Sequence, residues 1–210
     1  MPIIFNKEIN TDCKLAVWEI TESADWFKQQ LLLDGTEETF LSSIKNEHRR
    51  MHWLSSRVLL RTLLNTNLFI DLANDENGKP EVRNFEVHIS LSHSHKRSAL
   101  ILNHCNPVGI DVEHFDPKIE KISSRFVNQE EQKCLTENKR IEQLFKIWCA
   151  KEAAYKWYGK KQLDFKKHLT LKNFESKNDS PFLIIEKEKL HQTLTIGFEI
   201  LDDYLLSWAL

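Results

Sequence analysis

Residues 140–158 read RIEQLFKIWCAKEAAYKWY and form the strongest helix candidate of the chain. With 3.6 residues per turn, five of its apolar residues fall on one stripe, which predicts a helix packed against a core. Lys151 lies within that stripe, where an ammonium group is costly unless it reaches water or an anion. Glu152 and Lys156 share the flank, either as a plain ion pair or as part of a charged site. The stripe consists of Leu144, Ile147, Trp148, Tyr155 and Tyr158.

A second helix is predicted at 46–65, where Trp53, Leu60 and Leu64 recur on one face together with Arg57. Short stretches with alternating apolar residues follow each helix and predict strands. A helix followed by antiparallel strands thus occurs twice. We therefore expect an α+β fold of two similar lobes related by pseudo-two-fold symmetry, each a long helix packed on a small antiparallel sheet. The predicted strands cover 86–92, 98–102, 108–113, 169–171, 182–185, 194–200 and 204–208.

The composition is typical of a soluble protein. Of 210 residues, 41% are hydrophobic and 29% are charged, and the net charge of −2 argues against general nucleic-acid binding. No apolar run reaches the ~20 residues of a membrane helix, and the N-terminal sequence shows no secretory signal. The 4 cysteines form no CxxC pair, which indicates reduced thiols and a cytoplasmic protein. The 5 glycines form neither GxGxxG nor GxxxxGK[ST], so Rossmann and P-loop nucleotide sites are not indicated.

Asp111 and Glu113 indicate a metal site. Residues two apart in a strand point to the same side, so we expect both carboxylates together on one face and the apolar residues of 108–112 on the core face. Two like charges so placed repel, and a cation relieves the repulsion. Carboxylate oxygens without paired cysteines favour Mg²⁺. The alternative is an exposed edge strand with two solvated acids. Gly109 would let a ligand approach the backbone closely.

Further polar residues lie at turns and strand ends. Lys79 stands between Gly78 and Pro80, on a tight turn where it can hold an anion. Hydroxyls and imidazoles alternate in the stretch 92–95, at the end of a predicted strand. A zinc pair formed by its two histidines has no third ligand at a suitable spacing. A serine hydrolase site is not indicated either, because the nucleophile-elbow context is missing.

Taken in order, the chain's motifs resemble those of 4′-phosphopantetheinyl transferases. The last two, with the patterns G-[IV]-D-[VIL]-E and W-x-x-K-E-A-x-x-K, are together highly specific. The resemblance spans about residues 50–160, and the length is similar to the two-lobed type that activates peptide and polyketide synthetases, such as surfactin synthetase. The motifs are Gly78-Lys79-Pro80, Ser92-His93-Ser94, Gly109-Ile110-Asp111-Val112-Glu113, Arg125-Phe126 with Glu131, and the Trp148, Lys151, Glu152, Ala153 and Lys156 series.

The resemblance implies a transferase that moves the phosphopantetheine arm of coenzyme A onto a serine of an apo acyl or peptidyl carrier protein, releasing adenosine 3′,5′-bisphosphate. It implies a lobe at 1–106 for the nucleotide end and a lobe at 107–210 for the metal and the catalytic helix, with the active site at their interface. One chain would then act as a monomer. Between residues 139 and 172, ten Lys or Arg outnumber three Asp or Glu. This surplus suits an acidic carrier protein, or is a solvated lysine-rich face.

The same resemblance implies roles for individual residues. Asp111, Glu113 and Glu152 would hold Mg²⁺, and Lys156 would bind the diphosphate. Glu152 is the candidate for the base that takes the serine proton, although a water on the ion is an alternative because metal binding lowers a carboxylate's basicity. Position 52, where some relatives have arginine, is histidine here. Lys45, Arg49 and Arg50 are only guesses for the basic N-terminal residues that contact coenzyme A in some relatives. The expected catalytic residues are Glu152, Lys156 and His93, and the expected coenzyme A contacts are Arg57, Lys79, Pro80, Ser92, His93 and Lys156.

Two other functions compete with the transferase. The carboxylates would equally serve a Mg²⁺-dependent phosphohydrolase in which water replaces the serine. A third possibility is an inactive scaffold that binds carrier proteins or nucleotides without turnover.

Overall fold

The computed structural model describes residues 3–176 and 178–210 of the chain. Two compact units make up the chain. Unit 1 comprises Met1–Asp75 and Pro80–Asn106, and unit 2 comprises Glu76–Lys79 and Pro107–Leu210. The short segment Glu76–Lys79 therefore belongs to unit 2, although the chain on both sides of it belongs to unit 1. No helix within the described ranges is both long enough and apolar enough to cross a lipid bilayer.

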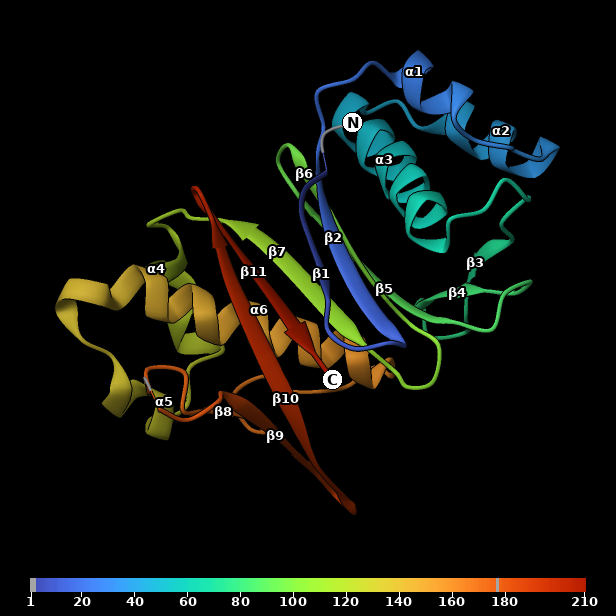
Figure 1. Ribbon diagram of the computed structural model, residues 1–210. Coiled ribbons are helices and arrows are strands. Elements are labelled where there is room, and N and C mark those ends of the chain that lie inside the picture. Colours follow the sequence, from blue (N-terminus) through green and yellow to red (C-terminus); the bar gives the residue numbers. More distant parts are fainter. Residues whose placement is uncertain (1–2, 177) are drawn as a thin grey trace. The chain divides into compact units, whose positions relative to one another are not determined.

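Unit 1 is built on a four-stranded antiparallel sheet with the strand order β1-β2-β6-β5. The long helix α3 packs against this sheet, mainly on β6 and β2 (Figure 1). A small two-stranded sheet of β3 and β4 lies beyond α3 in the chain. The elements are β1 (Ile3–Glu8), β2 (Cys13–Glu19), α1 (Ala24–Gln29), α2 (Gly35–Ser43), α3 (Glu47–Leu64), β3 (Leu72–Asn74), β4 (Pro80–Val82), β5 (His88–Ser94) and β6 (Arg97–Asn103).

Helix α3 confirms the prediction for 46–65, and its ends explain the agreement. The side chain of Asn46 accepts a hydrogen bond from the Arg49 amide at 2.9 Å and caps the N-terminus. At the other end Asn65 adopts a left-handed conformation with φ of 50°, which terminates the helix. Inside the unit, Ser55 Oγ lies 2.7 Å from Ser98 Oγ, and this buried contact joins α3 to β6.

Unit 2 is built on a five-stranded antiparallel sheet with the strand order β7-β11-β10-β9-β8. Helix α6 (Arg140–Tyr158) packs on β7 and β11 and has the predicted bounds. It ends at Gly159, whose φ of 67° is easily adopted by glycine. The other elements are β7 (Gly109–His114), α4 (Ile119–Ile122), α5 (Gln129–Cys134), β8 (Leu169–Lys172), β9 (Phe182–Lys187), β10 (Leu190–Leu201), β11 (Tyr204–Ala209) and the 3₁₀ helices Ser123–Arg125 and Glu137–Lys139.

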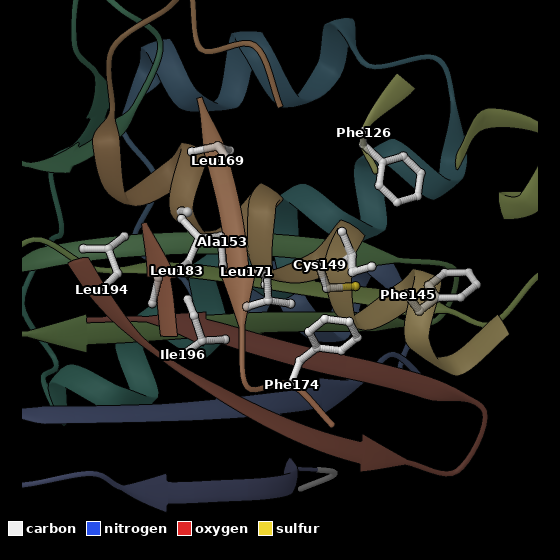
Figure 2. Close-up of a cluster of buried hydrophobic side chains, with 14 of the residues drawn as sticks. Phe126, Phe145, Cys149, Ala153, Leu169, Leu171, Phe174, Leu183, Leu194 and Ile196 are labelled. Carbon is white, nitrogen blue, oxygen red and sulfur yellow. The ribbon is translucent and has the colours of Figure 1, made fainter. Parts of the chain in front are cut away.

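The core of unit 2 lies between α6 and its sheet. Figure 2 shows Cys149 and Ala153 of α6 among side chains of the strands, such as Leu171, Leu183 and Ile196. All of these side chains are buried. Each unit thus contains a long helix on an antiparallel sheet, as predicted for the two lobes. The two-fold relation between the lobes stays a prediction.

Gly109 has a different role from the one expected. A Cβ atom at this position would lie 1.8 Å from the carbonyl oxygen of Ala153 and 2.8 Å from the Trp157 amide nitrogen. The backbone of α6 therefore occupies the space beside Gly109. Close approach of the helix, and not of a ligand, explains why this position takes glycine.

Candidate functional site

Asp111 and Lys156 form the centre of a charged site in unit 2. Lys156 Nζ donates to Asp111 Oδ1 at 2.8 Å and to the carbonyl oxygen of Ile110 at 2.9 Å. Asp111 is almost fully buried, whereas the Lys156 side chain is 27% exposed. The lysine is therefore held against β7 at its tip while part of its side chain stays accessible.

Glu113 and Glu152 complete an acidic group that we call the carboxylate cluster, consisting of Asp111, Glu113 and Glu152. Burial raises the pKa of Glu152 to about 7, and the negative charges of Asp111 and Glu113 add to the rise although Lys156 opposes it. Trp148 Nε1 donates to Glu113 Oε1 at 3.5 Å. The three predicted metal ligands are therefore close enough to interact electrostatically.

Cys149 of α6 is a further member of this neighbourhood. Its thiol is fully buried and hydrogen bonded to Asp111. Burial, followed by the charges of Asp111 and Glu113, raises its pKa well above the ordinary value. The thiol therefore stays protonated and acts as a hydrogen-bond donor beside the carboxylates.

The carboxylate cluster fits a divalent ion only as an open site. Among the residues that the structure describes, no group of three or more His, Cys, Asp or Glu is arranged to hold a metal ion. Lys156 already neutralises one oxygen of Asp111. Burial is the main cause of the raised pKa of Glu152, and the charges of Asp111 and Glu113 raise it further against the opposing effect of Lys156. Mg²⁺ commonly uses one or two carboxylates and completes its shell with water and phosphate oxygens, which suits this donor set.

The residues of β7 alternate between its two faces, as predicted. The carboxylates, however, lie on a covered face and not on a solvent-exposed one. We expected the carboxylates to lie opposite the core-facing apolar residues. Asp111 instead contacts Lys156 and Cys149 on α6, so the carboxylate face is the one that the helix covers. Ile110 and Val112 on the other face are also fully buried. Strand β7 lies at the edge of its sheet. Both of its faces are nevertheless covered, Asp111 is buried and Glu113 is half-buried, so they are not the solvated acids of the alternative.

Lys151 lies at the centre of a separate, wholly buried ion pair. Its ammonium group donates to Glu131 Oε2 at 2.8 Å and to the carbonyl oxygens of Phe126 and Phe165 at 2.7 and 2.9 Å. Glu131 Oε1 in turn accepts from the Leu171 amide at 2.9 Å. The lysine of the apolar stripe therefore does not reach water. It joins α5, α6 and β8, and its role is structural.

Unit 1 contains a cavity of about 480 Å³ between α2, α3 and the strands β3 and β5. Arg57 lies on its wall, donates from Nε to Glu37 Oε1 at 3.0 Å, and lies 3.5 Å above the centre of the Trp53 ring. Burial lowers the pKa of Arg57, and Glu37 opposes this effect. The residues lining the cavity include the predicted ligands Arg57, Pro80 and His93 and also Glu37, Phe40, Arg49, His52 and Trp53.

The remaining predicted coenzyme A contacts lie elsewhere. Lys79 belongs to unit 2, where its Nζ donates to the carbonyl oxygen of Trp157 at 3.0 Å and its side chain packs on Gly159. It therefore caps the C-terminal end of α6. Ser92 is buried on β5 and does not line the cavity.

Several residues of these sites were not among the predicted ones. Glu37 comes from α2, and Phe40 lies 5.9 Å from Trp53, measured between ring centres. The region before residue 46 gave no motif, so no signal in the sequence pointed to this wall of the cavity. Cys149 was hidden among apolar residues of the helix, where a thiol is normally a small hydrophobic side chain.

Comparison with known proteins finds a family match that lies within unit 2. Residues 107–209 match the family model of the 4′-phosphopantetheinyl transferase superfamily. A search of curated proteins finds no match. The matched segment contains β7 and α6, and with them the whole carboxylate cluster, Lys156 and the Lys151–Glu131 pair. The family match thus covers the segment that contains the carboxylate cluster.

Proposed function

We propose that this protein is a two-lobed, Mg²⁺-dependent 4′-phosphopantetheinyl transferase. Its substrates are coenzyme A and a serine hydroxyl of an apo acyl or peptidyl carrier protein. The serine oxygen forms a new bond to phosphorus, the diphosphate P–O bond breaks, and adenosine 3′,5′-bisphosphate leaves. The observation that carries this proposal is the group of three acids and Lys156 that β7 and α6 bring together within the matched segment.

Glu152 is proposed as the group that accepts the serine proton, directly or through a water molecule. A carboxyl group of ordinary pKa is a weak base near neutral pH, whereas the pKa of Glu152 without a bound ion is about 7. Mg²⁺ on this carboxylate would lower its basicity, so a water on the ion is the alternative proton acceptor. The burial of Glu152 and the charge of Asp111 therefore suit proton acceptance, although they make the ionised Glu152 carboxylate less favourable in the folded protein. Cys149 supports the arrangement by donating to Asp111.

The diphosphate is proposed to lie against Lys156 and the carboxylate cluster. When Mg²⁺ is bound there, it supplies positive charge that offsets the repulsion between carboxylates and phosphate oxygens. Lys156, fixed on Ile110 and Asp111, provides a further positive charge without a need to reorganise.

The cavity of unit 1 is proposed to hold the nucleotide end of coenzyme A. Its volume of about 480 Å³ is in the range of ligand pockets. Aromatic surfaces of Phe40 and Trp53 suit a purine base, while Arg49, Arg57 and the imidazole of His93 suit phosphate. The use of this cavity and of the carboxylate cluster by one coenzyme A molecule stays a prediction.

The carrier protein is proposed to be acidic. Five of the ten basic residues between 139 and 172 are engaged in ion pairs within unit 2, namely Arg140, Lys146, Lys151, Lys156 and Lys172. Lys160, Lys161, Lys166 and Lys167 are exposed, so they are the ones that suit an acidic partner. Action as a monomer in the cytoplasm completes the proposal.

The experiment incubates the protein with coenzyme A, Mg²⁺ and an apo carrier protein and follows the carrier by mass spectrometry. The expected result is a mass gain of one phosphopantetheine arm. Release of phosphate from coenzyme A without carrier modification would instead indicate a phosphohydrolase, and binding without turnover would indicate a scaffold.

Variants link the reaction to the site. Asp111→Ala is expected to lower the transfer rate by a factor of 100 or more (order of magnitude for loss of a positioned charge). Glu137→Gln, which removes an exposed acid near the start of α6, is the matched control and is expected to keep the wild-type rate. A wild-type rate in Asp111→Ala would contradict the proposed role of the carboxylate cluster.

A further inference from the structure

Two imidazole rings are stacked in the wall of the cavity of unit 1. The ring centres of His52 and His93 are 4.2 Å apart and the ring planes differ by 14°. Both residues line the cavity. We call His52 and His93 the imidazole pair. The pair joins α3 to β5, and the buried contact between Ser55 and Ser98 holds α3 on the same hairpin.

The hydrogen bond of His52 determines which of its nitrogens is a donor. His52 Nε2 lies 2.8 Å from the carbonyl oxygen of His95. A carbonyl only accepts, so Nε2 carries the proton, and Nδ1 of the neutral ring is an acceptor. In this state the second nitrogen of His52 repels a phosphate oxygen. Protonation converts it into a donor and adds a positive charge.

The surroundings of the pair oppose protonation as long as no anion is present. Burial is the main cause that lowers the pKa of His52, with smaller contributions from His48 and His95, whereas the bond to the His95 carbonyl opposes them. Two protonated rings at 4.2 Å would also repel each other. The other charged groups of the cavity are Arg49, Arg57 and Glu37, and Glu37 is paired with Arg57. A bound anion would therefore decide whether the pair takes up a proton.

We propose that the cavity of unit 1 binds the phosphomonoester of the nucleotide with uptake of a proton, which the imidazole pair holds. The proposal rests on coenzyme A being the ligand, as argued under the proposed function. The proton comes from the buffer, and no bond between heavier atoms forms or breaks. Affinity for the phosphomonoester is therefore pH-dependent in this protein, whereas an arginine at position 52 would keep its charge at all relevant pH values.

Calorimetric titration tests the proposal. Coenzyme A and 3′-dephospho-coenzyme A, which lacks the phosphomonoester, are titrated between pH 6 and 8.5 in two buffers with different ionisation enthalpies. We expect coenzyme A to take up on the order of one proton more than the dephospho compound near pH 7.5. Its affinity advantage is expected to fall by up to about tenfold per pH unit above the pKa of the pair.

Three variants of the imidazole pair separate its role from that of the rest of the cavity. His52→Gln is expected to lose most of the additional proton uptake, and His52→Arg to retain the advantage of coenzyme A at pH 8.5. His93→Gln provides a second test should substitution at position 52 perturb folding. His104→Gln, at an exposed turn of the same unit, is the control and is expected to behave as wild type.

The possible failures have different meanings. An affinity ratio that stays constant from pH 6 to 8.5, with equal proton uptake for both nucleotides, would overturn the inference alone. Unchanged proton uptake in His52→Gln and His93→Gln would also overturn it. Failure of both nucleotides to bind wild-type protein would overturn the proposed function and the inference together.

Discussion

Replacing Glu152 by glutamine tests the electrostatics of the carboxylate cluster through protein stability. Glutamine has nearly the same shape as the protonated acid but cannot ionise. The folded state raises the pKa of Glu152 from 4.5 to about 7, mainly by burial. Because one pKa unit corresponds to about 1.4 kcal/mol, the ionised carboxylate costs the folded state about 3 kcal/mol.

The sign of this effect depends on pH. Below pH 4.5 the carboxyl group is protonated in both the folded and the unfolded state, so Glu152 carries no penalty. Between pH 4.5 and about 7 the unfolded state ionises first, and the free energy of unfolding of the wild type falls as the pH rises. Above pH 7 the full penalty is present. Glu152→Gln is therefore expected to be more stable than wild type by about 3 kcal/mol at pH 8 and about equally stable at pH 4.5.

Urea denaturation followed by tryptophan fluorescence measures the difference. Wild type and Glu152→Gln are compared at pH 4.5 and 8 in the presence of a chelator, with Glu137→Gln as an exposed control. Adding Mg²⁺ at pH 8 is expected to stabilise wild type more than Glu152→Gln, because a ligand stabilises the state that binds it. Equal stability of the two proteins at pH 8, or a gain that is independent of pH, would refute the reasoning.

Three further predictions concern the structure of unit 2 and the metal. Lys151→Met is expected to lower the free energy of unfolding, measured by urea titration, by about 3–5 kcal/mol because it leaves the Glu131 charge buried without its partner. The double variant Lys151→Met with Glu131→Gln is expected to recover part of that loss. Gly109→Ala is expected to cost about 3 kcal/mol, measured in the same way, because its Cβ would lie 1.8 Å from the Ala153 carbonyl oxygen; an unchanged denaturation midpoint would show that α6 does not approach β7 so closely. Chelation of divalent ions is expected to abolish carrier modification in the mass assay, with recovery on addition of Mg²⁺, and undiminished transfer would contradict the metal dependence.

Periodicity along the chain was sufficient to predict the long helices. Both have an apolar stripe at helical spacing and clear ends, so 46–65 and 140–158 correspond closely to α3 and α6. Most strands after each helix were also recognisable from alternation, but the short strands β3 and β4 after α3 were not predicted. The first two strands were not predicted, although β2 lies inside the sheet of unit 1, because its run Cys13–Glu19 has an apolar core without regular alternation.

The spacing of Asp111 and Glu113, together with the helix motif, also identified the acids of the candidate site. The motif identified the acidic residues, and strand geometry alone places residues two apart on the same side. It could not show which face of β7 is covered, since Asp111, Ile110 and Val112 are all buried. That depends on the helix that packs on the strand, a contact between residues far apart in the chain.

What the sequence determined by itself was local: the helix periods, the strand alternation, and the types of residue at β7 and α6. Only the tertiary structure decided what the charged side chains contact. Lys151 binds Glu131, Lys156 binds Asp111, and Lys79 caps α6, and each of these partners comes from a different part of the chain. The physical reason is that burial and the distances between charges, which set pKa values and ion pairs, arise only when distant segments pack together.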